Sequence, residues 1–135
     1  MNMNSRLILS NRRENVNLLL EYVRTWAGDR GLPANRRRGL EKAAKEIFRH
    51  LITQAYRPGQ PGVIALALEQ KGPRLRLMFE DDAAPHNPAG LSSPPAPGDP
   101  PQGNCDFYNG LQQLAESLVY YRTGDRKNRL VVFLA

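Results

Sequence analysis

The chain has 135 residues, of which 41% are hydrophobic and 24% charged, and it contains a single cysteine. This length supports one domain with its own core, over residues 1–135. One cysteine excludes an intramolecular disulfide, as is usual in a reducing compartment. No apolar run approaches the roughly eighteen residues that a membrane span needs, and the first residues lack the apolar stretch of a secretion signal. We therefore expect a soluble, cytoplasmic protein.

The net charge of +6 is unevenly distributed along the chain. Residues 1–58 contain 12 Lys/Arg and 5 Asp/Glu, whereas residues 59–135 contain 7 and 8. A basic half can attract either nucleic acid or an acidic protein surface. The run Arg36–Arg38 has no interleaved aromatic residues and no DNA-reading motif around it. A solvated basic surface or the docking of an acidic protein partner is therefore favoured, and nucleic-acid binding is the weakest alternative.

The first half of the chain predicts one strand and two helices. Ser5–Leu9 has the composition of a short strand, and Asn11 with Glu14 has the spacing of a capping box. The first helix, ending at Gly28, carries an apolar stripe of Val16, Leu19, Leu20, Val23, Trp26 and Ala27. The second helix carries the longest stripe, which consists of Leu40, Ala43, Ala44, Ile47, Phe48, Leu51, Ile52 and Ala55.

The second half predicts strands separated by a long irregular segment. Val63–Leu68 and Leu75–Phe79 alternate apolar with other residues, and a turn over residues 71–73 joins them. Residues 83–105 include seven prolines, so this segment is expected to be an irregular loop.

A third helix is predicted over Phe107–Leu118, followed by a closing hairpin of Val119–Arg122 and Leu130–Leu134. The order β-α-α-β-β-loop-α-β-β predicts an α+β fold. It is a two-layer sandwich with helices on one face of a mixed, mostly antiparallel sheet.

A polar row flanks the apolar stripe of the second helix. Glu46, His50 and Gln54 are spaced i, i+4 and i+8, so they lie along one side of the helix. Leu75–Phe79 runs directly into the pair Asp81-Asp82, which is the natural candidate to face this row.

These residues carry a resemblance to a known family. The segment EKAAKEIFRHLITQAY resembles the helix that holds the first nucleotide motif of the histidine-kinase-like ATPases. It is most similar to the anti-sigma regulatory factors that act as serine/threonine protein kinases. Glu46 matches the acid of the motif and Ala55-Tyr56 its ending, whereas His50 replaces an asparagine and Gln54 a histidine.

Two further stretches extend the resemblance over about the whole chain. DDAAPHNP, which begins at Asp81, resembles the next motif of the family at a strand end, with Ala83 in place of a glycine. The closing stretch SLVYYRTGDRKNRLVVFLA resembles the final hairpin of the family, including Tyr120 and Asn128.

The resemblance implies ATP and Mg²⁺ as cofactors. Glu46 takes the place of the base near the attacking hydroxyl, and Asp81 that of the carboxylate that binds the adenine amino group. His50 occupies the position of the metal ligand. The Pro-rich loop over residues 83–105, with Gly103 near its end, stands where a glycine-rich lid wraps the phosphates. The implied cofactor-binding set is therefore Glu46, His50, Asp81, Ala83 and Gly103.

Three departures from the family pattern argue for weak or absent kinase activity. Imidazole at His50 suits zinc, copper or nickel better than magnesium. Ala83 would cost about 1–2 kcal/mol if its φ were positive. Asn104-Cys105-Asp106-Phe107 follows Gly103 where the family has more glycines, which makes a phosphate-binding nest harder to form.

Several alternatives remain at this stage. A transition-metal site of His50, His86 and Cys105 lacks any ligand-spacing pattern, so a buried hydrogen-bonding role for His50 is favoured. The resemblance implies a sigma factor or an anti-sigma antagonist as partner. The alternative is a protein-binding module on the same fold without nucleotide chemistry. Relatives often pair through their sheet or first helices, so a homodimer is also an expectation.

Overall fold

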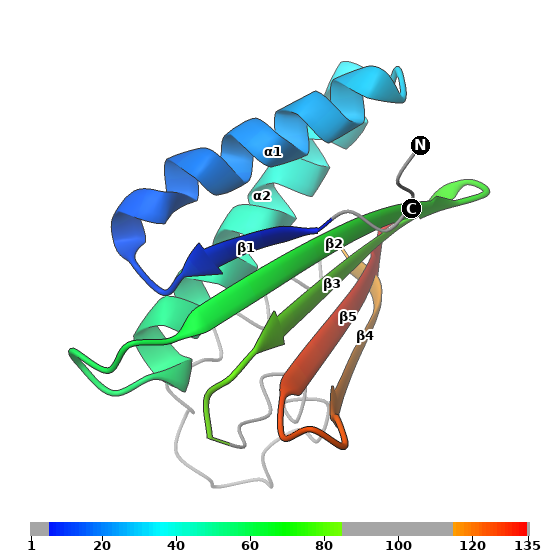
Figure 1. Cartoon of the computed structure of the whole chain (residues 1–135). Coiled ribbons are helices and arrows are strands. Elements are labelled where there is room, and N and C mark those ends of the chain that lie inside the picture. The colour runs from blue at the N-terminus through cyan, green and yellow to red at the C-terminus, as the bar shows by residue number, and fades with distance from the viewer. Residues whose placement is uncertain (1–5, 85–114, 135) are drawn as a thin grey trace, which may run out of the picture.

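The computed structural model describes residues 6–84 and 115–134, which form two layers. Two helices cover one face of a five-stranded sheet with the order β1-β2-β3-β5-β4 (Figure 1). All four strand pairings are antiparallel. The strands are β1 (Leu7–Ser10), β2 (Val63–Lys71), β3 (Arg74–Asp81), β4 (Ala115–Arg122) and β5 (Asn128–Leu134). The predicted α+β sandwich is confirmed.

The two helices follow β1 and pack against each other over the sheet (Figure 1). Helix α1 spans Val16–Asp29 and follows the short 3₁₀ turn η1 (Arg13–Asn15). Helix α2 spans Ala34–His50 and continues into a π-helical turn, η2 (Leu51–Ala55). The second apolar stripe therefore extends over α2 and η2, as its length predicted. Within the described parts of the chain, neither helix is long and apolar enough to cross a membrane.

The predicted capping box at the start of the first helix is wrong. Asn11 does not cap α1, because its side chain accepts a hydrogen bond from Gly62 N at 2.9 Å and donates one to Gln60 O at 2.9 Å. Asn15 precedes α1, and its side chain donates to Ser10 O instead. Asn11 therefore ties the β1–α1 connection to the loop before β2, a role that helix-start spacing cannot reveal.

The core lies between the helices and the face of the sheet that they cover. Along a strand successive side chains point to opposite faces. The alternating residues of β2, β3 and β5 that face the helices form the sheet half of the core: Ile64, Leu66, Leu68, Leu75, Leu77, Phe79, Leu130, Val132 and Leu134. By the same alternation, Asp81 and Asn128, at one end of β3 and β5, lie on this covered face.

The predicted third helix is wrong in the part that the structure describes. Residues 115–118 begin β4, which pairs with β5 in a ladder that includes Leu118↔Val132 and Tyr120↔Leu130. The spacing of Ala115 and Leu118 fits a helix, but it also allows a strand in which Leu118, Tyr120 and Arg122 alternate. Pairing with β5 overrides the local helical pattern. The remainder of that predicted helix, residues 107–114, lies outside the described residues.

Candidate functional site

Asp81 is the centre of a buried polar cluster at the end of β3. The residue is only 3% exposed, although the next residue, Asp82, is an exposed acid. Its Oδ1 accepts a hydrogen bond from Ala83 N at 3.0 Å and another from Asn128 Nδ2 at 2.8 Å. The register of the sheet explains the second bond, because Asp81 and Asn128 are direct partners across β3 and β5. A carboxylate can accept about four hydrogen bonds, so Asp81 is a strong acceptor at this position.

Asn128 connects this carboxylate to the closing hairpin. The residue is 1% exposed, and its Nδ2 also lies 3.1 Å from both Ala83 O and Ala84 O. Its Oδ1 accepts bonds from Tyr120 OH at 2.6 Å and from Arg122 Nη1 at 2.9 Å. Both the oxygen and the nitrogen of the Asn128 amide are therefore hydrogen-bonded, which fixes the orientation of this amide and of the Asp81 carboxylate. In the sequence analysis, Asn128 and Tyr120 entered only as part of the resemblance and were not linked to Asp81.

Ala83 fits its position without backbone strain. Among the described non-glycine residues only Arg126 has a positive φ, so the expected cost of an alanine in a left-handed conformation does not apply. The Ala83 residue is 2% exposed and belongs to the hydrophobic core cluster. Its carbonyl accepts a second bond from Arg122 Nη1 at 3.1 Å. Replacement of the family glycine therefore leaves the strand end intact.

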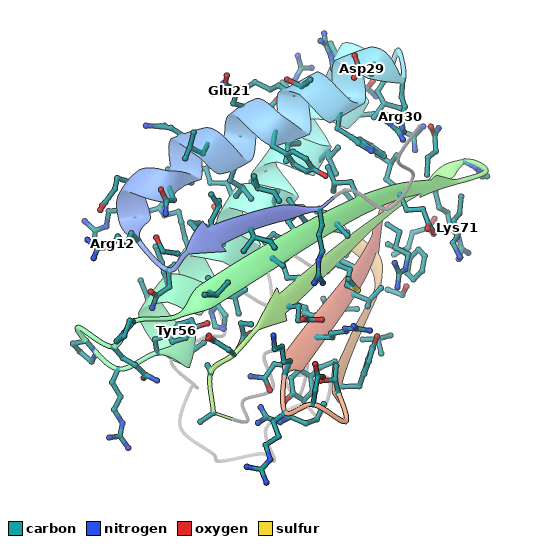
Figure 2. The ribbon with its side chains drawn as sticks, in the orientation of Figure 1. Arg12, Glu21, Asp29, Arg30, Tyr56 and Lys71 are labelled. Atoms are coloured by element: carbon teal, nitrogen blue, oxygen red, sulfur yellow. The ribbon has the colours of Figure 1, made fainter. Side chains whose placement is uncertain are left out.

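The second acid, Asp82, has a structural role. Its Oδ1 lies 2.7 Å from Tyr56 OH and 3.0 Å from Val63 N, so it joins the end of η2 to the start of β2. Figure 2 shows Tyr56 at this end of the helical layer. Burial, the hydrogen bond to Asp82 and the charges of Asp81 and Asp82 raise the pKa of Tyr56 above its ordinary value of 10.0. The hydroxyl therefore remains a donor at neutral pH.

The polar row on the second helix is less uniform than its spacing suggested. His50 is buried at the last residue of α2, Glu46 is half-buried, and Gln54 is exposed in η2. Glu46 makes no hydrogen bond or ion pair with any other described residue, so its predicted role as a base stays a prediction. Gln54 does not share the environment of His50.

The predicted metal role of His50 also stays a prediction. In residues 6–84 and 115–134, no group of three or more His, Cys, Asp and Glu side chains could hold a metal ion. His86, Gly103 and Cys105 lie outside the described residues, and so does the Pro-rich loop beyond residue 84.

The chain thus has the architecture of an α+β sandwich, in which helices cover one face of an antiparallel sheet and a buried carboxylate ends one strand. The sequence model described as the histidine kinase-like ATPase domain matches residues 9–132 of the chain. The protein therefore belongs to the histidine kinase-like ATPase domain family. No curated protein matches the chain.

Proposed function

We propose that the protein is an anti-sigma-type regulator of the cytoplasm, in which this ATPase domain binds a sigma factor, an anti-sigma antagonist or both. The observation that carries the proposal is the buried Asp81, placed at the end of β3 on the helix-covered face of a histidine kinase-like ATPase domain. Support comes also from the helix segment over residues 41–56, which keeps Glu46 and ends in Tyr56, and from the basic N-terminal half.

The adenine half of a nucleotide site fits the described residues. Asp81 is a buried acceptor held by Asn128, as recognition of an adenine amino group requires. The phosphate half fits less well, because His50 is a poor ligand for magnesium and the lid residues depart from the glycine-rich pattern. Bound Mg-ATP would supply the phosphoryl group to a serine of the antagonist, with Glu46 as the base. We infer that this activity is weak or absent.

A second candidate is a protein-binding module that has the same fold but does not bind a nucleotide. One observation favours it: Asp81 Oδ1 already accepts two hydrogen bonds from within the protein, from Ala83 N and Asn128 Nδ2. The Asp81 carboxylate thus has hydrogen-bond donors within the protein. Both candidates keep a protein partner, and they differ only in whether Asp81 also receives a nucleotide.

Calorimetric titration of the purified protein with ATP and with ADP, in the presence of magnesium, separates the two candidates. Binding that is lost in Asp81→Asn and kept in Asp29→Asn would support the nucleotide site. Asp29 is a suitable control because it is exposed at the far end of α1 (Figure 2). Binding would then justify a phosphorylation assay on a purified antagonist, with Glu46→Ala as the inactive control. No heat with either nucleotide would rule out the kinase.

The partner is tested separately, by titration of purified sigma factors and antagonists from the same genome into the protein. Saturable binding of one of them supports an anti-sigma role, whether or not nucleotide binds. Absence of binding to all of them, with and without Mg-ATP, would contradict the role itself.

A further inference from the structure

Two adjoining hollows lie outside the Asp81 cluster, at the end of the molecule where α1 begins. The first has a volume of about 400 Å³ and lies between the β1–α1 connection and the loop over residues 57–62. The second, of about 350 Å³, lies between the start of α1 and the last turns of α2. Ile52 lines both hollows, so they form one surface, which we call the basic groove.

The charge of the basic groove has a single sign. Its charged lining residues are all cations: Arg12, Arg13, Lys45, Arg49 and Arg57. No Asp or Glu is among the described lining residues. Arg12 has an acidic neighbour, Glu14, but the 3.9 Å ion pair is exposed on both sides and therefore weak. The other four cations form no ion pair within residues 6–84 and 115–134.

The floor of the basic groove is apolar. Val16 and Ile52 are partly buried and pack against the hydrophobic core, and each also lines a hollow. Lys45 and Arg49 are one helical turn apart, so they border this floor from the same side of α2. The surface thus presents a small apolar contact beside Lys45 and Arg49, neither of which forms an ion pair with another described residue.

We propose that the basic groove receives an acidic segment of a partner protein, with an apolar side chain of that segment against Val16 and Ile52. Carboxylates of the segment would pair with Lys45, Arg49 and the arginines around them. The proposal deepens the proposed function and rests on it only in assuming that the domain has a protein partner. A polynucleotide is disfavoured, because no aromatic residue for base stacking is among the described lining residues.

The test uses fluorescence anisotropy of a labelled peptide of repeated Glu-Glu-Leu units, titrated with the full-length protein. A peptide with Gln in place of Glu and a single-stranded DNA of similar length serve as comparison ligands. We expect the acidic peptide to bind, the Gln peptide not to bind, and the affinity to fall as salt is raised.

Two double variants locate the binding surface. Lys45→Glu/Arg49→Glu should weaken peptide binding by about tenfold or more, since it reverses two charges at the groove. Arg37→Glu/Arg38→Glu changes the net charge equally, at exposed positions of α2 that line neither hollow, and should leave binding nearly unchanged. Should the first variant fail to fold by circular dichroism, Arg13→Gln/Arg57→Gln tests the same surface at two exposed positions.

Three results would overturn the proposal: no peptide binding at low salt, equal loss in both double variants, or tighter binding of the DNA than of the peptide. The nucleotide test is independent of these results. Asp81→Asn removes the nucleotide contact without touching the basic groove, so it should keep full affinity for the peptide. If the unmodified protein binds the peptide but neither ATP nor ADP, the kinase is contradicted and the groove remains supported.

Discussion

Asn128 Nδ2 lies 2.8 Å from Asp81 Oδ1 and joins the ends of two neighbouring strands across 47 residues of sequence. Both residues are almost fully buried, so solvent would not replace the hydrogen bond between them if it were lost. The contact therefore couples the stability of the closing hairpin to the geometry of the candidate site.

Removal of the Asn128 amide should destabilise the fold. Asn128→Ala leaves Asp81 and Tyr120 without a shared partner in a buried position, and we expect the free energy of unfolding to fall by about 2–3 kcal/mol. Urea unfolding followed by circular dichroism measures the change. Tyr120→Phe, which removes the 2.6 Å bond to Asn128, should cost only about 1 kcal/mol. Equal losses in the two variants would contradict a central role for the amide.

The hydrogen bond between Tyr56 and Asp82 should produce a pH dependence at alkaline pH. The pKa of Tyr56 is raised in the folded protein, so above the ordinary value of 10.0 only the unfolded chain releases this proton. The contribution of the phenol is complete below pH 10.0 and decreases as the pH rises above it. Tyr56→Phe should show a shallower decrease of unfolding free energy across this range. Parallel decreases in the two proteins would show that Tyr56 is not responsible.

The same tyrosine explains a requirement for glycine at position 62. A Cβ at Gly62 would overlap the Tyr56 ring, whereas a Cβ at Gly39 would meet nothing within 4 Å. Gly62→Ala should therefore destabilise the protein by about 1–3 kcal/mol through overpacking. Gly39→Ala, within α2, should instead stabilise it by up to about 1 kcal/mol. Thermal unfolding of both variants tests whether the two changes in stability have opposite signs. Stabilisation by Gly62→Ala would contradict the close packing of the Tyr56 ring against Gly62.

A buried carboxylate on the other face of the sheet organises a separate cluster of cations. Glu80 is 8% exposed in its side chain and lies 2.7 Å from Arg129 Nε, 3.8 Å from Arg6 Nη1 and 3.9 Å from Lys127 Nζ. Glu80→Gln leaves these cations without a counter-charge, and we expect a loss of about 1–3 kcal/mol in unfolding free energy.

The exposed pair of Glu69 and Lys71, with N···O at 3.3 Å, provides a matched control for Glu80. Glu69→Gln should cost less than about 1 kcal/mol, because exposed ion pairs contribute little. Urea unfolding measures both variants, and a larger loss for Glu69→Gln than for Glu80→Gln would contradict the assignment.

The sequence predicted most of the fold because its signals were periodic. The stripes from Val16 to Ala27 and from Leu40 to Ala55 correspond to α1 and to α2 with η2, and the alternating segments correspond to β2, β3 and β5. The capping box at Asn11 and the helix over residues 115–118 were wrong for one reason. In both places a contact distant in sequence, with Gly62 or with β5, decided the structure.

The sequence drew attention to Asp81 and Asp82, but it did not predict the hydrogen bonds that these two acids make. The strand-end position of Asp81-Asp82 indicated a special role for an acid, yet alternation alone could not tell which of the two points inward. The partners of each acid, Asn128 for Asp81 and Tyr56 for Asp82, are 47 and 26 residues away. Such pairings depend on strand order, which a single sequence does not specify.

The strand order also has a consequence for synthesis of the protein. The ribosome adds about 5–20 residues per second, so Asn128 emerges several seconds after Asp81. In the sheet order β1-β2-β3-β5-β4, the C-terminal strand is the one that lies against β3. A nascent chain that has already formed its helices and first hairpin therefore still exposes the Asp81 edge of β3. Until the last segment docks, that edge is open to pairing with a strand of another chain.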